Sequence, residues 1–156
     1  MDKFIGFLIR CIVWFAKYTA ILSKLGIGEY EEWQEGKKIK FLLVGYNGVR
    51  NTGADARVAA MTEQIENVFG ADRVQISVMT LDKKTMRGYF NERIRMIPFS
   101  TIFLREIYIE CSRHHVSILC EGSTLKSTFA NALTMCFCEV AGIMKNQHKP
   151  CIAYGS

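Results

Sequence analysis

From residue 39 onwards the chain alternates between short apolar runs and longer segments in which apolar residues recur at helical spacing. The short runs have the length and composition of strands, and they cover 39–44, 74–79, 93–98, 116–120 and 151–154. The helical segments cover 55–69, 101–115 and 130–144. This alternation predicts an α/β fold, with a Rossmann-like, mostly parallel five-stranded sheet and helices on both faces.

The first 25 residues have a different pattern. They predict one strongly apolar helix whose cations are spaced seven apart, at Lys3, Arg10, Lys17 and Lys24. A step of seven drifts only about 20° around a helix, so the cations lie on one narrow stripe. With Trp14 beside it, the stripe is typical of an amphipathic helix lying in the interface of an anionic membrane. The alternative is a helix packed on the domain itself or on a partner protein.

Charges interrupt this helix too often for a membrane span or a signal peptide. The polar segment 26–38 then reads as a linker. The expected organisation is therefore an interfacial helix over 1–25, a linker over 26–38 and one domain over 39–156.

A glycine-rich loop follows the first predicted strand and leads into a helix. Backbone N–H groups of such a loop and the positive end of the helix can hold an anion together. The spacing is not that of a dinucleotide fingerprint, and no Walker lysine follows. The alternative is a turn that only tightens the connection, with Thr52 or Asp55 capping the helix. The residues predicted to bind substrate here are Gly45, Asn47, Gly48, Asn51, Thr52 and Gly53.

A second polar loop follows the fourth predicted strand. In open α/β sheets ligands bind at the carboxyl ends of strands, so both loops could line one crevice. Capping of the next helix by Ser127 or Thr128 is the alternative. The residues predicted to bind substrate in this loop are Gly122, Ser123, Thr124 and Lys126, with Glu121 as a candidate catalytic carboxylate beside Asp55.

Composition narrows the possible functions. The chain has 156 residues, 49% of them hydrophobic, which is enough for one domain with a substantial core. A net charge of +5 without a dense basic patch argues against a nucleic-acid binder. The six cysteines are mostly in apolar runs and are expected to be buried free thiols, and no metal site or cofactor is predicted.

The two loops together resemble a known family. Segment 45–56 is similar to the opening motif of polysaccharide pyruvyl transferases, in which glycines alternate with an aromatic residue and an asparagine ahead of an acidic pair. Segments 116–125 and 149–156 resemble two later strands of that family, each followed by a glycine turn. Ala54 stands where the family usually has aspartate, and Glu121 begins a loop that in the family is a run of glycines.

The resemblance implies the amino-terminal half of a GT-B-like two-domain enzyme at the cytoplasmic face of the cell membrane. Family members transfer a pyruvyl group from phosphoenolpyruvate to a sugar of a cell-surface polysaccharide. Asp55 and Glu121 would then act on a sugar hydroxyl, and the isolated half, lacking its carboxyl-terminal partner, is expected to be inactive. The alternatives are a non-catalytic sugar- or nucleotide-binding module and a glycosyltransferase acceptor domain.

Overall fold

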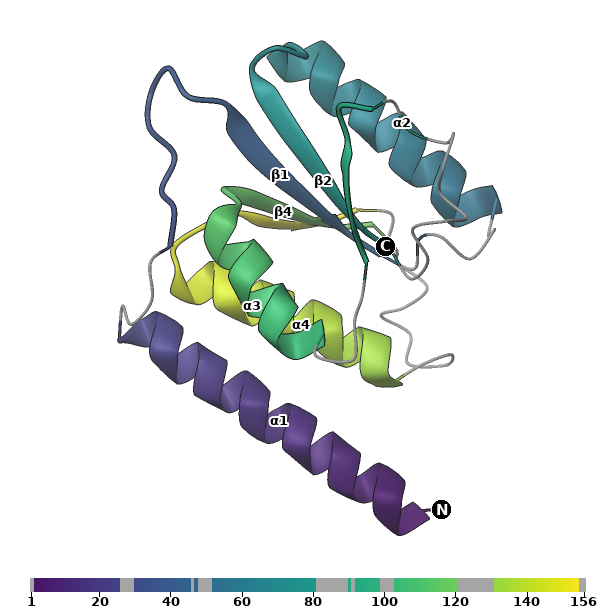
Figure 1. Cartoon of the computed structure of the whole chain (residues 1–156), viewed down its shortest axis with the longest axis vertical. Helices are drawn as coiled ribbons and strands as arrows, with labels where there is room; N and C mark the ends of the chain where they lie inside the picture. Colours follow the sequence, from purple (N-terminus) through teal and green to yellow (C-terminus); the bar gives the residue numbers. More distant parts are fainter. Residues whose placement is uncertain are drawn as a thin grey trace.

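The computed structural model describes residues 2–25, 30–45, 47, 52–80, 90, 92–98, 103–120 and 131–154. Its helices are α1 (Asp2–Lys24), α2 (Thr52–Phe69), α3 (Phe103–Arg113) and α4 (Asn131–Asn146). Its strands are β1 (Ile39–Val44), β2 (Val74–Thr80), β3 (Arg95–Pro98), β4 (Val116–Leu119) and β5 (Cys151–Ala153). Helix α2 covers one face of the sheet, whereas α3 and α4 cover the other, with α1 outside them (Figure 1).

The sheet is five-stranded, in the order β3-β2-β1-β4-β5, and all four strand pairings are parallel. The predicted α/β fold is therefore confirmed, and the sheet is parallel throughout. The order places β1 at the centre and β3 and β5 at the edges, which is the arrangement of a doubly wound sheet. The chain leaves β1 towards β2 on one side and later returns to β4 on the other side.

Alternation along β1 builds a separate core on each face of the sheet. Phe41 and Leu43 pack in the core on the α2 side, together with Val58 and Ile65 of that helix. Leu42 and Val44 point the other way and pack with residues of α3 and α4, among them Phe137. An uninterrupted apolar run is thus explained by burial on both faces.

The helix ends differ slightly from the predicted ones. Gly70 ends α2 with a φ of 89°, which a side chain would disfavour, and its N–H donates to Glu66 O at 2.8 Å. Helix α2 begins at Thr52 and Asp55 lies inside its first turn, so of the two capping residues that the sequence offered, only Thr52 lies at the end of the helix. Proline-ended β3 is two residues shorter than predicted and forms an edge of the sheet, where proline is tolerated.

Helix α1 lies against α4 and α3, so part of its surface packs within the molecule (Figure 1). Thr19 is buried, and the side-chain amide of Asn146 donates to Ala20 O at 3.3 Å. The described part of the linker is also fastened to the domain, since Glu31 N donates to Ser112 O at 2.8 Å. Segment 30–38 is therefore not an independent tether.

The six cysteines form no disulfide, and three of them, Cys111, Cys120 and Cys136, are buried as expected. Cys151 is half-buried, whereas Cys11 and Cys138 are exposed, contrary to the expectation. Cys138 lies two residues from buried Cys136 on α4, and a step of two turns the side chain about 200° around a helix.

Candidate functional site

The carboxyl ends of β1 and β4 meet at one rim of the sheet. The two strands are parallel neighbours, with Val44 beside Leu119, and Cys120 N donates to Val44 O at 2.8 Å just past the last pair. The glycine loop leaves from β1 at this rim and the second polar loop leaves from β4. The connections of β1 and β4 run on opposite faces of the sheet, so this rim is the topological switch point at which doubly wound proteins bind ligands.

Glycine is needed at position 45 because a side chain would crowd its neighbours, and not because the backbone has a positive φ. A Cβ at this position would lie 3.1 Å from Cys120 Cβ and 3.2 Å from side-chain atoms of Asn47. Among the described residues, positive φ at glycine occurs only at Gly36 and Gly70. The absence of a side chain at Gly45 therefore lets the ends of β1 and β4 approach each other.

Asn47 is completely buried and ties the loop to the end of β2. Its side-chain nitrogen donates to Met79 O at 3.1 Å, and its backbone carbonyl oxygen accepts from Thr80 Oγ1 at 3.2 Å. Its Oδ1 has no hydrogen-bond partner within the described residues. The amide nitrogen is thus committed to the fold, and any contact of Asn47 with substrate remains a prediction that would use Oδ1.

The start of α2 brings the predicted carboxylate to the same rim but buries it. Asp55 is 1% exposed and lies in the first turn of the helix, where the positive end of the helix dipole favours a negative charge. Ala54 is also buried, whereas Gly53 is exposed. The position that the family usually fills with aspartate therefore lies in the protein interior.

Arg57 is a rim residue that the sequence reasoning missed. Its guanidinium donates to Cys120 O at 3.3 Å and so joins the second turn of α2 to the end of β4. The sequence signal that could have identified Arg57 is a cation two residues after Asp55. Arg57 therefore places a positive charge between the start of α2 and the end of β4.

Several predicted site residues lie outside the described part of the chain. They are Gly48, Asn51, Glu121, Gly122, Ser123, Thr124 and Lys126. Thr52 is described only as the first residue of α2. The structure thus brings Gly45, Asn47, Asp55 and Arg57 to one rim.

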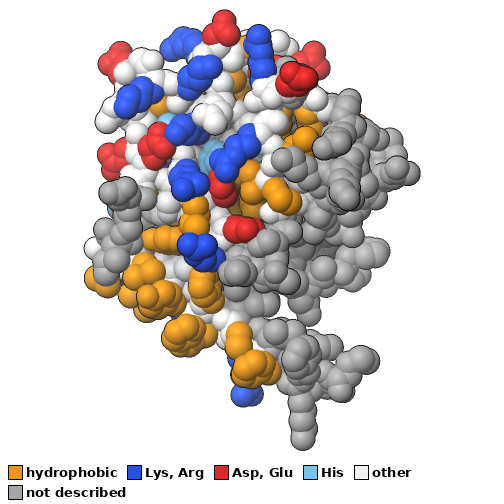
Figure 2. Space-filling model, in the orientation of Figure 1, with side chains coloured by type: hydrophobic (Ala, Val, Ile, Leu, Met, Phe, Trp, Pro, Cys, Tyr) orange, Lys and Arg blue, Asp and Glu red, His pale blue; other side chains and the backbone are white. Residues whose placement is uncertain are grey.

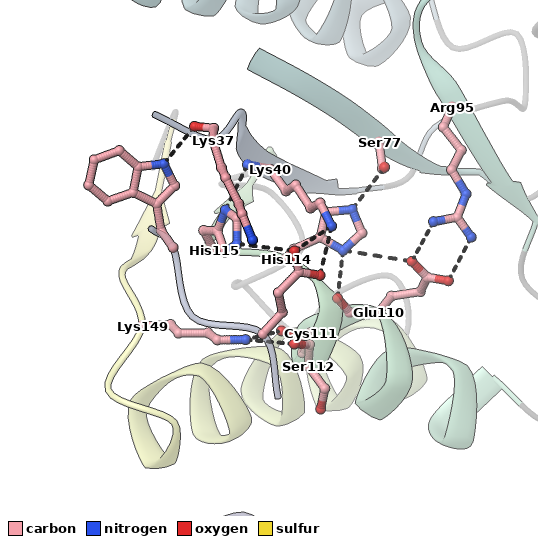
Figure 3. A network of polar contacts seen from close by, with 12 residues as sticks. Lys37, Lys40, Ser77, Arg95, Glu110, Cys111, Ser112, His114, His115 and Lys149 are labelled. Atoms are coloured by element: carbon pink, nitrogen blue, oxygen red, sulfur yellow. Dashed lines mark hydrogen bonds and ion pairs between the residues drawn. The ribbon is translucent and has the colours of Figure 1, made fainter. Parts of the chain in front are cut away.

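A second polar cluster, which sequence reasoning also missed, lies between the sheet and α3 (Figure 3). His114 Nδ1 lies 2.6 Å from Glu110 O, and Nε2 lies 2.8 Å from Ser77 Oγ. Burial lowers the pKa of His114 to about 4, so the ring is neutral, donates from Nδ1 to the carbonyl and accepts from Ser77 at Nε2. Arg95 holds the Glu110 carboxylate with two bonds of 2.9 and 3.1 Å.

Ser77, His114 and Glu110 are the residue types of a catalytic nucleophile, base and acid, but His114 Nδ1 bonds the backbone carbonyl of Glu110 and lies 3.7 Å from its carboxylate. Ser77 is also fully buried in the middle strands, and Glu110 is already neutralised by Arg95. A substrate carbonyl could not reach Ser77 without opening the sheet. The cluster therefore holds β2 and β3 to α3 and is not a hydrolytic site.

Lys149, which follows α4 in sequence, binds backbone carbonyl groups at the carboxyl end of α3. Its ammonium donates to Cys111 O at 3.0 Å and Ser112 O at 2.8 Å, and burial lowers the pKa of Lys149 to about 8 (Figure 3). A cation at the carbonyl end of a helix is favourable there. Beside it, Lys40 binds the Glu31 carboxylate at 2.6 Å, and this contact lowers the pKa of Glu31.

Within the part of the chain that the structure describes, no three His, Cys, Asp or Glu side chains are grouped as metal ligands. In the same residues, no helix has the length and apolarity needed to cross a bilayer. No protein-family model matches this chain, and no curated protein and no solved structure has significant similarity to it.

Proposed function

We propose that this chain forms one side of the substrate crevice of a polysaccharide pyruvyl transferase-like enzyme. In this proposal the rim between β1 and β4 binds phosphoenolpyruvate next to a saccharide acceptor. The observation that carries the proposal is the pairing of β1 with β4, because it starts both predicted loops from one switch point. The loops provide backbone N–H groups, and Arg57 adds a cation for an anionic ligand.

The proposed roles follow from the chemistry of the side chains. The anion lies against the N–H groups of the glycine loop and the positive end of α2, with Lys126 offsetting its charge. Glu121 accepts the proton of the attacking sugar hydroxyl, because Asp55 is only 1% exposed and a substrate cannot reach it in this conformation. The hydroxyls of Ser123 and Thr124 orient the acceptor. A second half, implied by the resemblance, supplies the rest of the crevice.

Phosphoenolpyruvate binding to the full chain, measured by calorimetry, tests this proposal. Lys126→Ala should weaken binding by roughly tenfold, since a charge-assisted hydrogen bond contributes about 1.5 kcal/mol. Lys145→Ala is the matched control, because Lys145 is exposed in the last turn of α4 and should leave binding unchanged. Pyruvate, which lacks the phosphate, should bind more weakly than phosphoenolpyruvate.

Two results would contradict the proposal. One is the absence of any binding heat with phosphoenolpyruvate at millimolar concentrations. The other is efficient ketal formation on a glycan by this chain without a second half, which would show that the proposed division of the crevice is wrong.

A non-catalytic binding module is the second candidate, and one observation favours it. Asp55 is buried and Ala54 replaces its acidic neighbour, so in this conformation the rim lacks an exposed acidic pair on α2. Binding of a nucleotide sugar in place of phosphoenolpyruvate would support the module or a glycosyltransferase acceptor domain.

A further inference from the structure

We propose that the outward surface of α1 docks on an anionic lipid membrane, with the helix lying flat along the bilayer. The outer face of α1 is defined by the exposed apolar residues Phe7, Trp14, Tyr18, Ile21 and Leu25 and by the exposed cations Arg10, Lys17 and Lys24. This inference is independent of the chemistry proposed for the rim.

One face of α1 packs within the molecule, and the other is exposed. Its inner face includes buried Thr19 and half-buried Phe15 and Leu22, and it packs on α4 and α3. The outer face remains uncovered, with Trp14 67% and Leu25 64% exposed. Intramolecular packing therefore accounts for only one of the two apolar faces, and large exposed apolar patches mark interaction sites.

The charges on α1 are all of one sign beyond its first residue. No Asp or Glu occurs between Lys3 and Leu25. Arg10, Lys17 and Lys24 recur every seven residues, so they follow one line along the exposed surface. The lower part of Figure 2, where α1 runs, shows hydrophobic side chains with basic side chains between them.

The aromatic residues on this face suit the boundary between lipid headgroups and acyl chains. The rings of Trp14 and Tyr18 are stacked, with centroids 5.7 Å apart and planes 3° from parallel. Trp and Tyr prefer the interface because each has an apolar body and a polar group. Apolar side chains can enter the acyl boundary while Arg10 and Lys17 extend to lipid phosphates.

Charge complementarity favours a membrane over a second copy of the chain. Two outer faces packed together would bring their lines of cations close to each other, and neither helix has an acid beyond its first residue, Asp2. An anionic bilayer instead offers negative charge along the whole helix. Helix α2 lies on the opposite side of the molecule from α1, so the bilayer would lie below α1 in the view of Figure 1.

Co-sedimentation of the full chain with vesicles tests the proposal. Vesicles of phosphatidylcholine with one third phosphatidylglycerol should bind the protein, whereas pure phosphatidylcholine should bind it weakly. The triple variant Arg10→Gln, Lys17→Gln, Lys24→Gln should lose on the order of 100-fold in partition coefficient, since each surface cation contributes about fivefold. Lys37→Gln, Lys38→Gln, Arg73→Gln removes equal charge from exposed positions outside α1 and should retain nearly all binding.

Fluorescence of Trp14 locates the contact. In a Trp33→Phe background, anionic vesicles should shift Trp14 emission to shorter wavelengths and reduce its quenching by acrylamide. Trp14→Ala with Tyr18→Ala should weaken binding at least tenfold while leaving the circular dichroism spectrum unchanged.

Three results would overturn the proposal. The first is equal binding of the triple variant and the wild type. The second is a dimer in lipid-free solution that Trp14→Ala dissociates, which would assign the outer face to a second copy. The third is a Trp14 emission spectrum that vesicles do not shift, which would indicate that the outer face binds an acidic protein instead.

Discussion

At the scale of single residues, two buried ionisable side chains should make stability depend on pH in opposite directions. Glu139 is 5% exposed on α4, and neither of its carboxylate oxygens has a hydrogen-bond partner among the described residues. Burial raises the pKa of Glu139 to about 7, and burial lowers the pKa of His114 to about 4. Between these two values both side chains are neutral in the folded protein.

The two groups should give opposite pH dependences. Glu139 ionises near its ordinary pKa of 4.5 when unfolded, so its contribution to stability decreases as pH rises from 4.5 to about 7. His114 protonates near its ordinary pKa of 6.5 when unfolded, so its contribution decreases as pH falls from 6.5 to about 4. Each effect amounts to roughly 3 kcal/mol over its range. In the wild type the two slopes largely cancel where the ranges overlap.

Single substitutions should reveal the separate slopes. We expect Glu139→Gln to lose stability on acidification below about pH 6.5, because only the effect of His114 remains. We expect His114→Gln to gain stability on acidification below about pH 7, because only the effect of Glu139 remains. Urea denaturation across this pH range provides the measurement. A variant whose profile runs parallel to that of the wild type would show that the replaced group does not titrate as described.

At the scale of elements, the close approach of β1 and β4 determines the candidate site. The sequence predicted both strands and a glycine after the first, and it explained that glycine by positive φ. The structure instead shows Gly45 next to Cys120, which directly follows β4 and lies 75 residues further along the chain. Such a contact has no local sequence signal, because it depends on which strands become neighbours.

Replacing each of two glycines with alanine distinguishes the effect of side-chain crowding on stability from the effect of backbone freedom. Gly45→Ala should destabilise the protein by about 1–3 kcal/mol, because its Cβ would press on Cys120. Gly142→Ala is the control within α4, where an added Cβ meets no atom within 4 Å, and it should stabilise by about 0.5–1 kcal/mol. Thermal unfolding measures both changes. Equal effects of the two substitutions would argue against close packing at the rim.

At the scale of the whole molecule, α1 belongs partly to the domain. The sequence predicted the helix and its basic stripe, and it left open whether the apolar surface faces a membrane, a partner or the domain. The structure seats one face on α4, since Asn146 contacts Ala20, and leaves the other exposed. Glu139 precedes Asn146 by seven residues and so lies on the same side of α4.

Deleting residues 1–25 should therefore lower stability and not simply detach a tail. Loss of the packing around Phe15, Thr19 and Leu22 is expected to reduce the free energy of unfolding by roughly 2–4 kcal/mol. The full-length triple variant Arg10→Gln, Lys17→Gln, Lys24→Gln changes only the outer face, so its stability should stay within about 0.5 kcal/mol. Urea denaturation compares the three proteins. Unchanged stability after the deletion would contradict the packing of α1 on α4.

The sequence by itself determined the strands and helices, the parallel sheet and the presence of a glycine loop, because hydrophobic periodicity and glycine positions are local. Only the tertiary structure decided that β1 and β4 adjoin, that Asn47 and Asp55 are buried, and that Arg57 reaches Cys120. It also decided which face of α1 stays exposed. These features depend on contacts between distant segments, and burial, hydrogen bonding and pKa are properties of such contacts.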